Sequence, residues 1–517
     1  MSKAGEILKE TVAYIKKHKR YPSFTDMKRM GITPKSIEYH FTSITKLKDE
    51  AYKQCRDVVF DLEQEIYRST PHKGIKNFVI TTAVLGDQVM PGFLASIKTY
   101  CKMNKAELIV IPAIENLAKT GWTLDPSLRG EIIVTDDLSL NDNAFILGIQ
   151  SKARTADPVT GLPRIGQRNG SFISASPKQR LKFVATGANS LPHALMSTGA
   201  ITLPSYTNAG IMTSKATYTA NHDHVMGAII LELDKDNLFH FRQIQADRQG
   251  QFADLGMLYK PGKRTDMPPE AMIMGDWHSG ETDPSAETAW RRLGFLTKAK
   301  SWVVHDGYSS TSTNHHIDHK HLSKTNLAER RNSSIARELL HYRADLMSML
   351  KIAPKLVIVK SNHDEHLERY LQEGRYVTDP ENHRISLKLA SAMLDGHNPI
   401  EWFITQHTDK KITKDIKWLK RDESYKVAGI ELGQHGDHGA NGAKGSITSL
   451  EQAYGNGVFG HTHSPEILRG AWRVGTSSLL QLDYNRGASS WFHTSCLVYP
   501  NGQRQLINSI NGKFTNE

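Results

Sequence analysis

In the second half of the chain, short apolar runs alternate with polar segments, and each run has the character of a buried strand. The runs are Ala271–Met274, Trp302–Val304, Leu356–Val359, Val427–Leu432 and Gly457–Phe459. Short apolar runs bounded by turn-forming residues are typical of strands that are covered on both faces. The pattern therefore predicts an α/β domain over residues 270–517.

Residues that can bind metal ions follow every one of these runs. In chain order they are Asp276 and His278, Asp306, Asn362, His435, and His461 with His463. Open α/β sheets bind ligands at the carboxyl ends of their strands, so we expect these side chains to gather at one place. Carboxylate, amide and imidazole donors without a thiolate favour Mn²⁺ or Fe, with Zn²⁺ or Ni²⁺ as alternatives.

Residues 75–260 have the pattern of a separate α/β domain. Phe78–Ile80, a helix from Pro91 to Met103, and Leu108–Ile111 predict a strand–helix–strand unit. Further strands are expected at Glu131–Val134, Ala144–Leu147, Lys182–Ala185 and Val225–Leu233. No phosphate-binding glycine loop or ligand cluster indicates a role for this domain. Tyr259–Pro269, rich in proline, glycine and charge, is expected to be a linker.

Residues 1–70 are expected to form a small helical unit. A first helix ends in a basic run, a second one stops at Gly31, and Thr33-Pro34 is typical of the start of a third. This order resembles a helix-turn-helix and, more narrowly, the helix-turn-helix repeats associated with homing endonucleases. The residues expected to contact DNA are Arg20, Lys28, Arg29, Lys35 and Tyr39. The alternative is a packing or oligomerisation module with a solvated basic face.

Composition narrows the class of protein. The chain has 517 residues and a formal net charge of +11, which favours a polyanionic partner, DNA first. No apolar run is long enough for a membrane span, so we expect no membrane partner. The N-terminus lacks the apolar core of a signal peptide, so we expect a cytoplasmic location, which is the host cytoplasm if a phage encodes the chain. Three scattered cysteines exclude a disulfide framework. We also expect a homo-oligomer.

The five polar blocks together resemble the calcineurin-like metallophosphoesterases, over residues 270–517. The blocks are Asp-x-His, Asp-Gly, Asn-His-Asp, His-Gly and Gly-His-x-His. His305 and Ser361 stand where the family usually has glycine, which affects the local loops rather than the ligands. The resemblance implies a two-sheet αββα core and two divalent metal ions. It assigns Asp276, His278 and His463 to the first ion, Asn362, His435 and His461 to the second, and Asp306 to both.

The same resemblance implies roles for two neighbours of Asn362. His363 would act on the leaving oxygen as a general acid or charge stabiliser, and Asp364 would orient His363. The His-rich segment 314–321 opens an insertion before the third block, and a helix over Leu327–Leu350 follows it. That segment is expected to be an exposed or substrate-side loop, although a third metal site is an alternative.

Three classes of function remain open. The first is a metal-dependent DNase similar to the SbcD-type nuclease branch of the family, and the overall layout also resembles the pre-early DNases of siphophages that transfer their genome in two steps. The second is a small-molecule phosphodiesterase or nucleotide phosphatase. The third is a non-catalytic scaffold, which has no need of a complete set of metal donors. The net charge and the basic helical unit favour the DNase.

Overall fold

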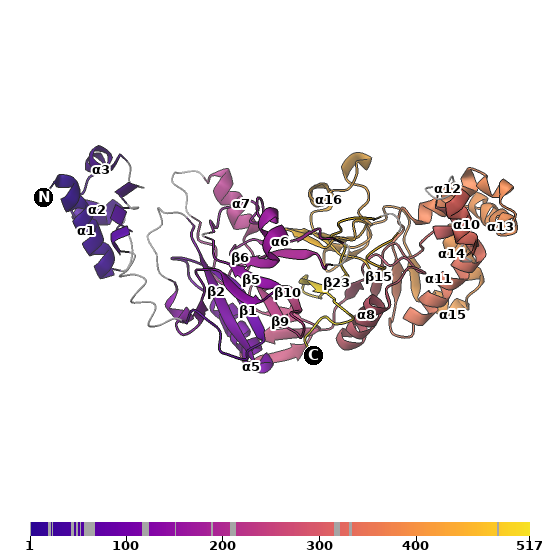
Figure 1. Cartoon of the computed structure of the whole chain (residues 1–517), viewed down its shortest axis with the longest axis horizontal. Coiled ribbons are helices and arrows are strands. Elements are labelled where there is room, and N and C mark those ends of the chain that lie inside the picture. Colours follow the sequence, from indigo (N-terminus) through magenta and orange to yellow (C-terminus); the bar gives the residue numbers. More distant parts are fainter. Residues whose placement is uncertain are drawn as a thin grey trace. The chain divides into compact units, whose positions relative to one another are not determined.

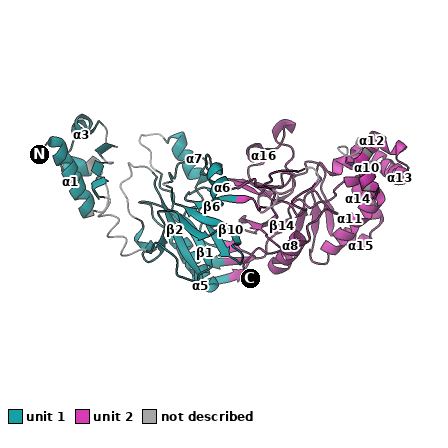
Figure 2. Cartoon of the chain, in the orientation of Figure 1, with its two compact units in different colours: residues 1–180, 194–252, 259–264 teal, residues 181–193, 253–258, 265–517 magenta. Residues whose placement is uncertain are grey.

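The computed structural model describes residues 2–18, 22, 24–42, 46–47, 50–51, 53–55, 68–115, 124–149, 151–187, 190–206, 213–314, 321–329, 333–482 and 485–517. The chain divides into two compact units, shown in Figure 2. Unit 1 comprises residues 1–180, 194–252 and 259–264, and unit 2 comprises residues 181–193, 253–258 and 265–517. Within the described residues, no helix combines the length and apolar character needed to cross a bilayer.

Unit 1 begins with three short helices, α1 (Lys3–His18), α2 (Phe24–Arg29) and α3 (Pro34–Phe41). They share a small core that includes Ile7, Ile15, Met27, Ile37 and Phe41. The expected start of α3 is confirmed: the Thr33 side chain accepts a hydrogen bond from the Ser36 backbone N at 3.2 Å, and Pro34 occupies the first turn. Most of the helix expected from Lys46 to Tyr67 lies outside the described residues.

The strand–helix–strand unit is confirmed. Strand β1 (Asn77–Val84) pairs in parallel with β2 (Ala106–Ala113), and α5 (Pro91–Asn104) connects them. The sheet order is β10-β9-β1-β2-β3, with β9 (Gly227–Leu233) antiparallel to both β1 and β10 (Phe239–Gln245). The apolar pattern did not predict β10. Its apolar residues are interrupted by the polar residues His240, Arg242 and Gln243, which are nevertheless buried.

Shorter elements fill the chain between residues 126 and 266. They are η1 (Pro126–Leu128), β3 (Ile132–Ile133), β4 (Leu138–Asn141), β5 (Ala144–Leu147), α6 (Pro163–Asn169), β6 (Ser171–Ser174), β7 (Gln179–Val184), β8 (His193–Thr198), α7 (Lys215–Asp223), β11 (Phe252–Asp254), β12 (Met257–Lys260) and β13 (Lys263–Asp266). The expectation of a linker at Tyr259–Pro269 is wrong, because β12 and β13 occupy most of that segment. Gly262, with φ +76°, makes the tight turn between them.

Unit 2 contains a six-stranded sheet that carries most of the predicted strands. Its order is β17 (Ile416–Trp418), β16 (Leu356–Ile358), β15 (Trp302–Val304), β14 (Ala271–Ile273), β23 (Thr494–Val498) and β24 (Arg504–Asn508). The first four strands are parallel, whereas β23 is antiparallel to β14 and to β24. Residues of β14, β15 and β16 are completely buried, as their apolar sequences predict.

Unit 2 also contains α8 (Pro284–Thr297), α10 (His321–Glu329), α11 (Ile335–Met349), α12 (Asp364–Gln372), α13 (His383–Leu394), α14 (Pro399–Gln406) and α15 (Lys410–Thr413), with η2 (Thr311–Thr313) and η3 (Arg375–Thr378) (Figure 1). Residues of α8, α11, α12, α13 and α14 pack with the strands in one large core. Trp290, Leu339 and Leu346 pack with Met272 and Trp302 of the strands. The single helix expected over Leu327–Leu350 is wrong: α10 ends at Glu329, and Ser334 precedes a new helix.

A second group of strands in unit 2 runs in the order β18 (Lys426–Val427), β19 (Ile430–Glu431), β20 (Gly457–Phe459), β22 (Ala471–Arg473) and β21 (Glu466–Leu468), with α16 (Ile447–Tyr454) packed on it and η4 (Ala440–Gly442) nearby. The expectation of one strand over Val427–Leu432 is wrong. Ala428 and Gly429 both have positive φ, 49° and 81°, so the run folds into a two-residue hairpin.

A buried arginine ties the two strand groups of unit 2 together. Arg504 of β24 donates hydrogen bonds to the carbonyl oxygens of Gly457 at 3.1 Å and Gly470 at 2.7 Å. Its guanidinium also lies 4.3 Å from the centre of the Trp472 indole. Gly457 is the first residue of β20 and Gly470 directly precedes β22, so these hydrogen bonds join β24 of the first strand group to the second strand group.

Candidate metal centre

The candidate ligands follow strands that belong to both strand groups of unit 2. Asp276 and His278 follow β14, Asp306 follows β15, and Asn362 follows β16. From the other group, His435 follows β19, and His461 and His463 follow β20. The parallel strands β14, β15 and β16 are direct neighbours, so their carboxyl ends lie side by side at one edge of the sheet.

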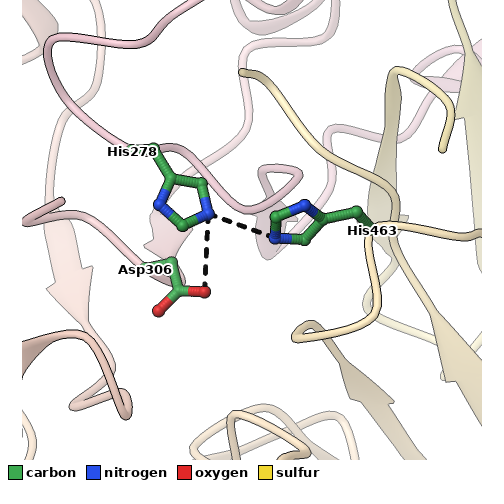
Figure 3. A group of neighbouring side chains, drawn as sticks. All are labelled: His278, Asp306 and His463. Atoms are coloured by element: carbon green, nitrogen blue, oxygen red, sulfur yellow. Dashed lines mark hydrogen bonds and ion pairs between the residues drawn. The ribbon is translucent and has the colours of Figure 1, made fainter. Parts of the chain in front are cut away.

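One group of potential ligands consists of His278, Asp306 and His463 (Figure 3). The Nε2 atom of His278 lies 3.1 Å from the Nε2 atom of His463 and 3.7 Å from Oδ2 of Asp306. All three residues are buried. Two ring nitrogens and a carboxylate oxygen that converge in this way form a suitable donor set for a divalent cation.

A second group consists of Asp276, Asp306 and His435, so that Asp306 belongs to both. The Oδ2 atom of Asp306 lies 3.2 Å from Nε2 of His435. Asp276 also contacts the first group, because its Oδ2 lies 3.3 Å from Nε2 of His463. A carboxylate common to two donor groups is the arrangement that lets one residue bridge two cations.

The remaining two expected ligands are His461 and Asn362. The ring of His461 stands at 81° to that of His435, with centres 5.3 Å apart, and its backbone N–H donates a hydrogen bond of 2.5 Å to Oδ2 of Asp276. The Oδ1 atom of Asn362 is buried and has no hydrogen-bond partner among the described residues. The structure therefore brings together Asp276, His278, Asp306, His435 and His463, with His461 in contact with Asp276 and His435.

Unpartnered atoms test whether the residues fit bound cations. Oδ1 of Asp276, Oδ1 of Asp306 and Nδ1 of His463 are also buried without a hydrogen-bond partner in the described parts of the chain. An orphaned buried carboxylate oxygen is costly unless it is paired or coordinates a metal. Cations bound to these oxygens would remove that cost, so the residues present fit a metal centre.

The backbone at the centre is held in an unusual conformation. His278, Asp306, His461 and His463 have positive φ angles of 51°, 44°, 74° and 57°. Non-glycine residues adopt this region at an energetic cost, and such residues cluster at functional sites. Gly460 adds a steric requirement, because a Cβ atom there would lie 2.1 Å from Oδ1 of Asp276.

Burial and mutual charge set the protonation of the cluster. Burial lowers the pKa of His278 to about 3 and that of His461 to about 4, and it lowers the pKa of His463 well below its ordinary value. These imidazoles are therefore neutral, the form that binds metal ions. Burial opposes charge on His435 as well, but Asp306 raises its pKa to about 9.

His363 lies beside the cluster, and the residue that orients its ring is Ser309 and not the expected Asp364. Its ring centre is 4.6 Å from that of His278, and its Nδ1 atom donates a hydrogen bond of 2.9 Å to the carbonyl oxygen of Ser309. The expectation that Asp364 orients His363 is wrong. Oδ2 of Asp364 instead accepts hydrogen bonds from the backbone N and hydroxyl of Ser361, at 2.8 and 3.3 Å. Asp364 begins helix α12, and this position turns its carboxylate back toward Ser361.

A carboxylate on α11 holds the loop that carries Ser309. Glu338 accepts hydrogen bonds from the backbone N of Thr311 at 2.7 Å and of Ser312 at 3.1 Å, and from the hydroxyl of Tyr308 at 3.1 Å. Sequence reasoning missed both Ser309 and Glu338. Ser309 contacts His363 through its backbone carbonyl, a group that every residue has, so the sequence could not single it out. Glu338 is twenty-seven residues from Thr311, and its position in the first turn of a helix indicated only a capping role.

The two departures from the family pattern have different structural settings. Ser361, in place of glycine, is buried and supplies the two donors to Asp364. His305 is completely buried, its ring stacks at 28° to that of His435 with centres 5.8 Å apart, and burial lowers its pKa to about 3. Nothing in the structure explains why a histidine stands at this position.

The residues expected to contact DNA lie in unit 1, whereas the candidate metal ligands lie in unit 2. Lys28 and Arg29 are exposed at the end of α2, and Lys35 and Tyr39 are exposed on α3, with Tyr39 84% accessible. Arg20 and residues 315–320 of the His-rich segment lie outside the described residues. The exposed positions fit a surface role and leave its nature open.

Sequence comparison places the chain among known proteins. It is 30% identical over 472 residues to Protein A1 of Escherichia phage T5, covering 85% of this chain and 83% of that protein. The chain belongs to the Protein A1 family. Membership of this family supports a phage origin. No protein-family sequence model matches the chain, and no solved structure matches it.

Proposed function

We propose that this member of the Protein A1 family is a metal-dependent phosphodiesterase that cleaves DNA. The observation that carries the proposal is the pair of buried carboxylate–imidazole groups that share Asp306. A two-cation site of this kind suits the in-line displacement of a phosphate ester, in which both the attacking and the leaving oxygen need stabilisation. A scaffold protein has no need of buried donors with orphaned oxygen atoms.

The donors divide between two cations around Asp306. His278, His463 and Asp276 would hold one, and His435, His461 and Asn362 the other. Mixed nitrogen and oxygen donors favour Mn²⁺ or Fe, with Zn²⁺ or Ni²⁺ as alternatives. Two such cations, when bound, neutralise charge on the phosphoryl oxygens and acidify the attacking water.

His363 supplies the protein's own contribution to bond cleavage. Because its Nδ1–H is donated to the Ser309 carbonyl, its Nε2 atom is the one left to meet the substrate. We assign to Nε2 the transfer of a proton, or of a hydrogen bond, to the leaving oxygen. Glu338 holds the loop of Ser309 and thereby fixes the orientation of the ring.

DNA is the proposed substrate because of charge. The chain carries a net charge of +11, and exposed Lys28, Arg29 and Lys35 occupy short helices of unit 1. Basic surfaces increase affinity for nucleic acid through release of counterions from the phosphates. The homing-endonuclease-like order of these helices supports the same partner.

The test begins with protein stripped by EDTA and its metal content measured by elemental analysis. Plasmid DNA and bis(4-nitrophenyl) phosphate are then supplied with Mn²⁺, Mg²⁺, Zn²⁺ or no metal. We expect Mn²⁺ to restore hydrolysis of both substrates. Hydrolysis of the small ester alone would favour a small-molecule phosphodiesterase, and no hydrolysis with any metal would contradict the proposal.

A further inference from the structure

A cavity lies one strand further along the sheet edge that carries the metal ligands. It has a volume of about 780 Å³, within the range of about 300–1,000 Å³ that is usual for small-molecule sites. Its walls include Lys360 and Asp364 on either side of Asn362, Leu419 and Arg421 just after β17, and Asn398 and Trp402 at the start of α14. The cavity is therefore next to the segment that supplies Asn362 and His363.

Two tryptophans line the cavity. Trp402 and Trp418 are both partly buried, and each packs against the large hydrophobic core of unit 2 while also lining the cavity. Packing against the core holds each ring in place, so little side-chain entropy is lost when a ligand stacks on it. Fixed aromatic rings are the surfaces on which proteins stack nucleobases, whatever the base.

The charges around the cavity disfavour a free phosphate. Lys360 pairs with Glu368 at 2.7 Å, and Arg421 pairs with Asp437 at 2.5 Å and with Glu365 at 3.5 Å. Glu401 and Glu423 also line the walls. Lys360 and Arg421 are already paired with carboxylates, and Lys420, which also lines the cavity, acts electrostatically on Glu401 and Glu423. A second anion would therefore gain little there. A neutral ring with hydrogen-bonding edges is the better match.

We propose that this cavity binds the base and sugar of the nucleotide next to the scissile phosphate. The inference rests on the proposed function, since it places that phosphate at the metal centre. A base in the cavity cannot remain stacked within a duplex, so the preferred substrate is a single strand or an unpaired end. The metal centre then cleaves the strand, and the cavity selects strands whose bases are free to leave the stack.

The first test compares phosphodiesters with the same leaving group. Bis(4-nitrophenyl) phosphate has no nucleoside, whereas the 5′- and 3′-(4-nitrophenyl phosphate) esters of thymidine carry one on either side of phosphorus. We expect the protein to prefer one thymidine ester in kcat/KM, and Trp402→Leu to reduce that preference by about 10-fold, the usual worth of one stacked base. Thr405→Phe, which fills the cavity from α14, should have the same effect.

The matched control is Phe295→Leu, which removes an aromatic ring that is 79% exposed on α8 and does not line the cavity. It should leave the preference between esters unchanged. The inference is overturned if the unmodified protein prefers neither thymidine ester over bis(4-nitrophenyl) phosphate. It is also overturned if Trp402→Leu and Thr405→Phe, both folded by circular dichroism, keep the preference of the unmodified protein.

A second measurement separates this inference from the proposed function. Deoxyadenosine and inorganic phosphate are titrated separately into EDTA-treated protein while tryptophan fluorescence is recorded. We expect saturable quenching by deoxyadenosine that Trp402→Leu removes, and none by phosphate. A response to phosphate alone, or no saturable response to deoxyadenosine, overturns the cavity assignment. If no nitrophenyl ester is hydrolysed with any metal, the proposed function fails, and this titration still decides whether the cavity binds a nucleoside.

Discussion

The Nε2 atoms of His278 and His463 lie 3.1 Å apart although 185 residues separate them in the chain. Both imidazoles are buried, and burial keeps their pKa values low, so both are neutral near pH 7. Two lone pairs aimed at one point would repel each other unless one nitrogen carried its proton or a cation lay between them. A cation held together with the adjoining carboxylate of Asp306 would remove that repulsion, and the Asp306 prediction below tests this.

Asp306 is the residue on which both donor groups depend. We expect Asp306→Ala to lower the bound metal of the purified protein and to reduce turnover by more than about 100-fold, because loss of a hydrogen-bond partner of a metal ligand already costs about 10–100-fold. Elemental analysis and hydrolysis of bis(4-nitrophenyl) phosphate measure the two effects. The control is Asp422→Ala, which removes an exposed carboxylate. Two metal ions retained with normal activity would remove Asp306 from the bridging role.

His363 should affect the chemical step and not metal binding. We expect His363→Ala to keep its metal content while turnover of DNA falls by about 10²–10⁴-fold, the usual contribution of a positioned proton donor. The loss should be smaller for a nitrophenyl ester, because nitrophenolate leaves without help from an acid. Equal losses on good and poor leaving groups would exclude the acid role.

Glu338 is expected to act through the loop it holds. Glu338→Ala leaves the backbone N–H groups of Thr311 and Ser312 without their acceptor, which should reduce the free energy of unfolding by about 1–3 kcal/mol. Because Ser309 then no longer holds His363 in place, turnover of DNA should fall by up to about 10²-fold. Calorimetry and the same pair of leaving groups measure the two effects. Unchanged turnover in a destabilised variant would limit Glu338 to a structural role.

His224 provides a pH-dependent prediction in unit 1. Its Nε2–H donates to the Thr202 carbonyl at 2.9 Å, so its Nδ1 accepts from the Tyr206 hydroxyl at 3.0 Å, and burial lowers its pKa from 6.5 to about 4. A lowered histidine pKa means that the unfolded chain binds the proton more readily than the folded one. Its contribution to stability is therefore complete above pH 6.5 and is lost as the pH falls toward 4, by about 3 kcal/mol.

The measurement is urea denaturation of the unmodified protein and of His224→Gln between pH 7 and pH 4. Glutamine can donate to Thr202 and accept from Tyr206 but does not titrate, so the variant should gain stability relative to the unmodified protein as the pH falls. Exposed His222→Gln is the matched control and should show no such relative gain. Parallel pH profiles for His224→Gln and the unmodified protein would contradict the prediction.

The basic helices of unit 1 should contribute to DNA binding through phosphate contacts. Changing Lys28, Arg29 and Lys35 together to glutamine should weaken DNA binding and reduce the slope of log K against log salt by about 0.9 for each lost contact. Hydrolysis of bis(4-nitrophenyl) phosphate should not change, since the candidate metal ligands all belong to unit 2.

A control with the same loss of charge uses the exposed unit 2 residues Lys298, Lys351 and Lys414. If these three produce an equal change in slope, the effect is one of total charge and not of the helices. Sedimentation of the unit 1 variant tests the oligomerisation alternative, which predicts a change in molecular mass at an unaltered salt slope.

Much of the candidate centre could be predicted from local sequence. Runs such as Ala271–Met274 and Leu356–Val359 are apolar because both faces of their strands are covered, and the polar residues that follow are therefore at strand ends. The start of α3 could be predicted for a similar reason, since Thr33 and Pro34 act within one turn. In each case the physical cause lies within a few residues along the chain.

Only the tertiary structure decided which of these residues meet. Asp306 is shared by two donor groups because β15 lies beside β14 and because β20, from another strand group, brings His463 to the same point. The orientation of His363 by the carbonyl of Ser309, which is 54 residues away in the chain, was likewise decided by the structure. The order of strands in a sheet and the choice of backbone acceptors depend on contacts between distant segments. The pattern of apolar and polar residues along the chain does not specify those contacts.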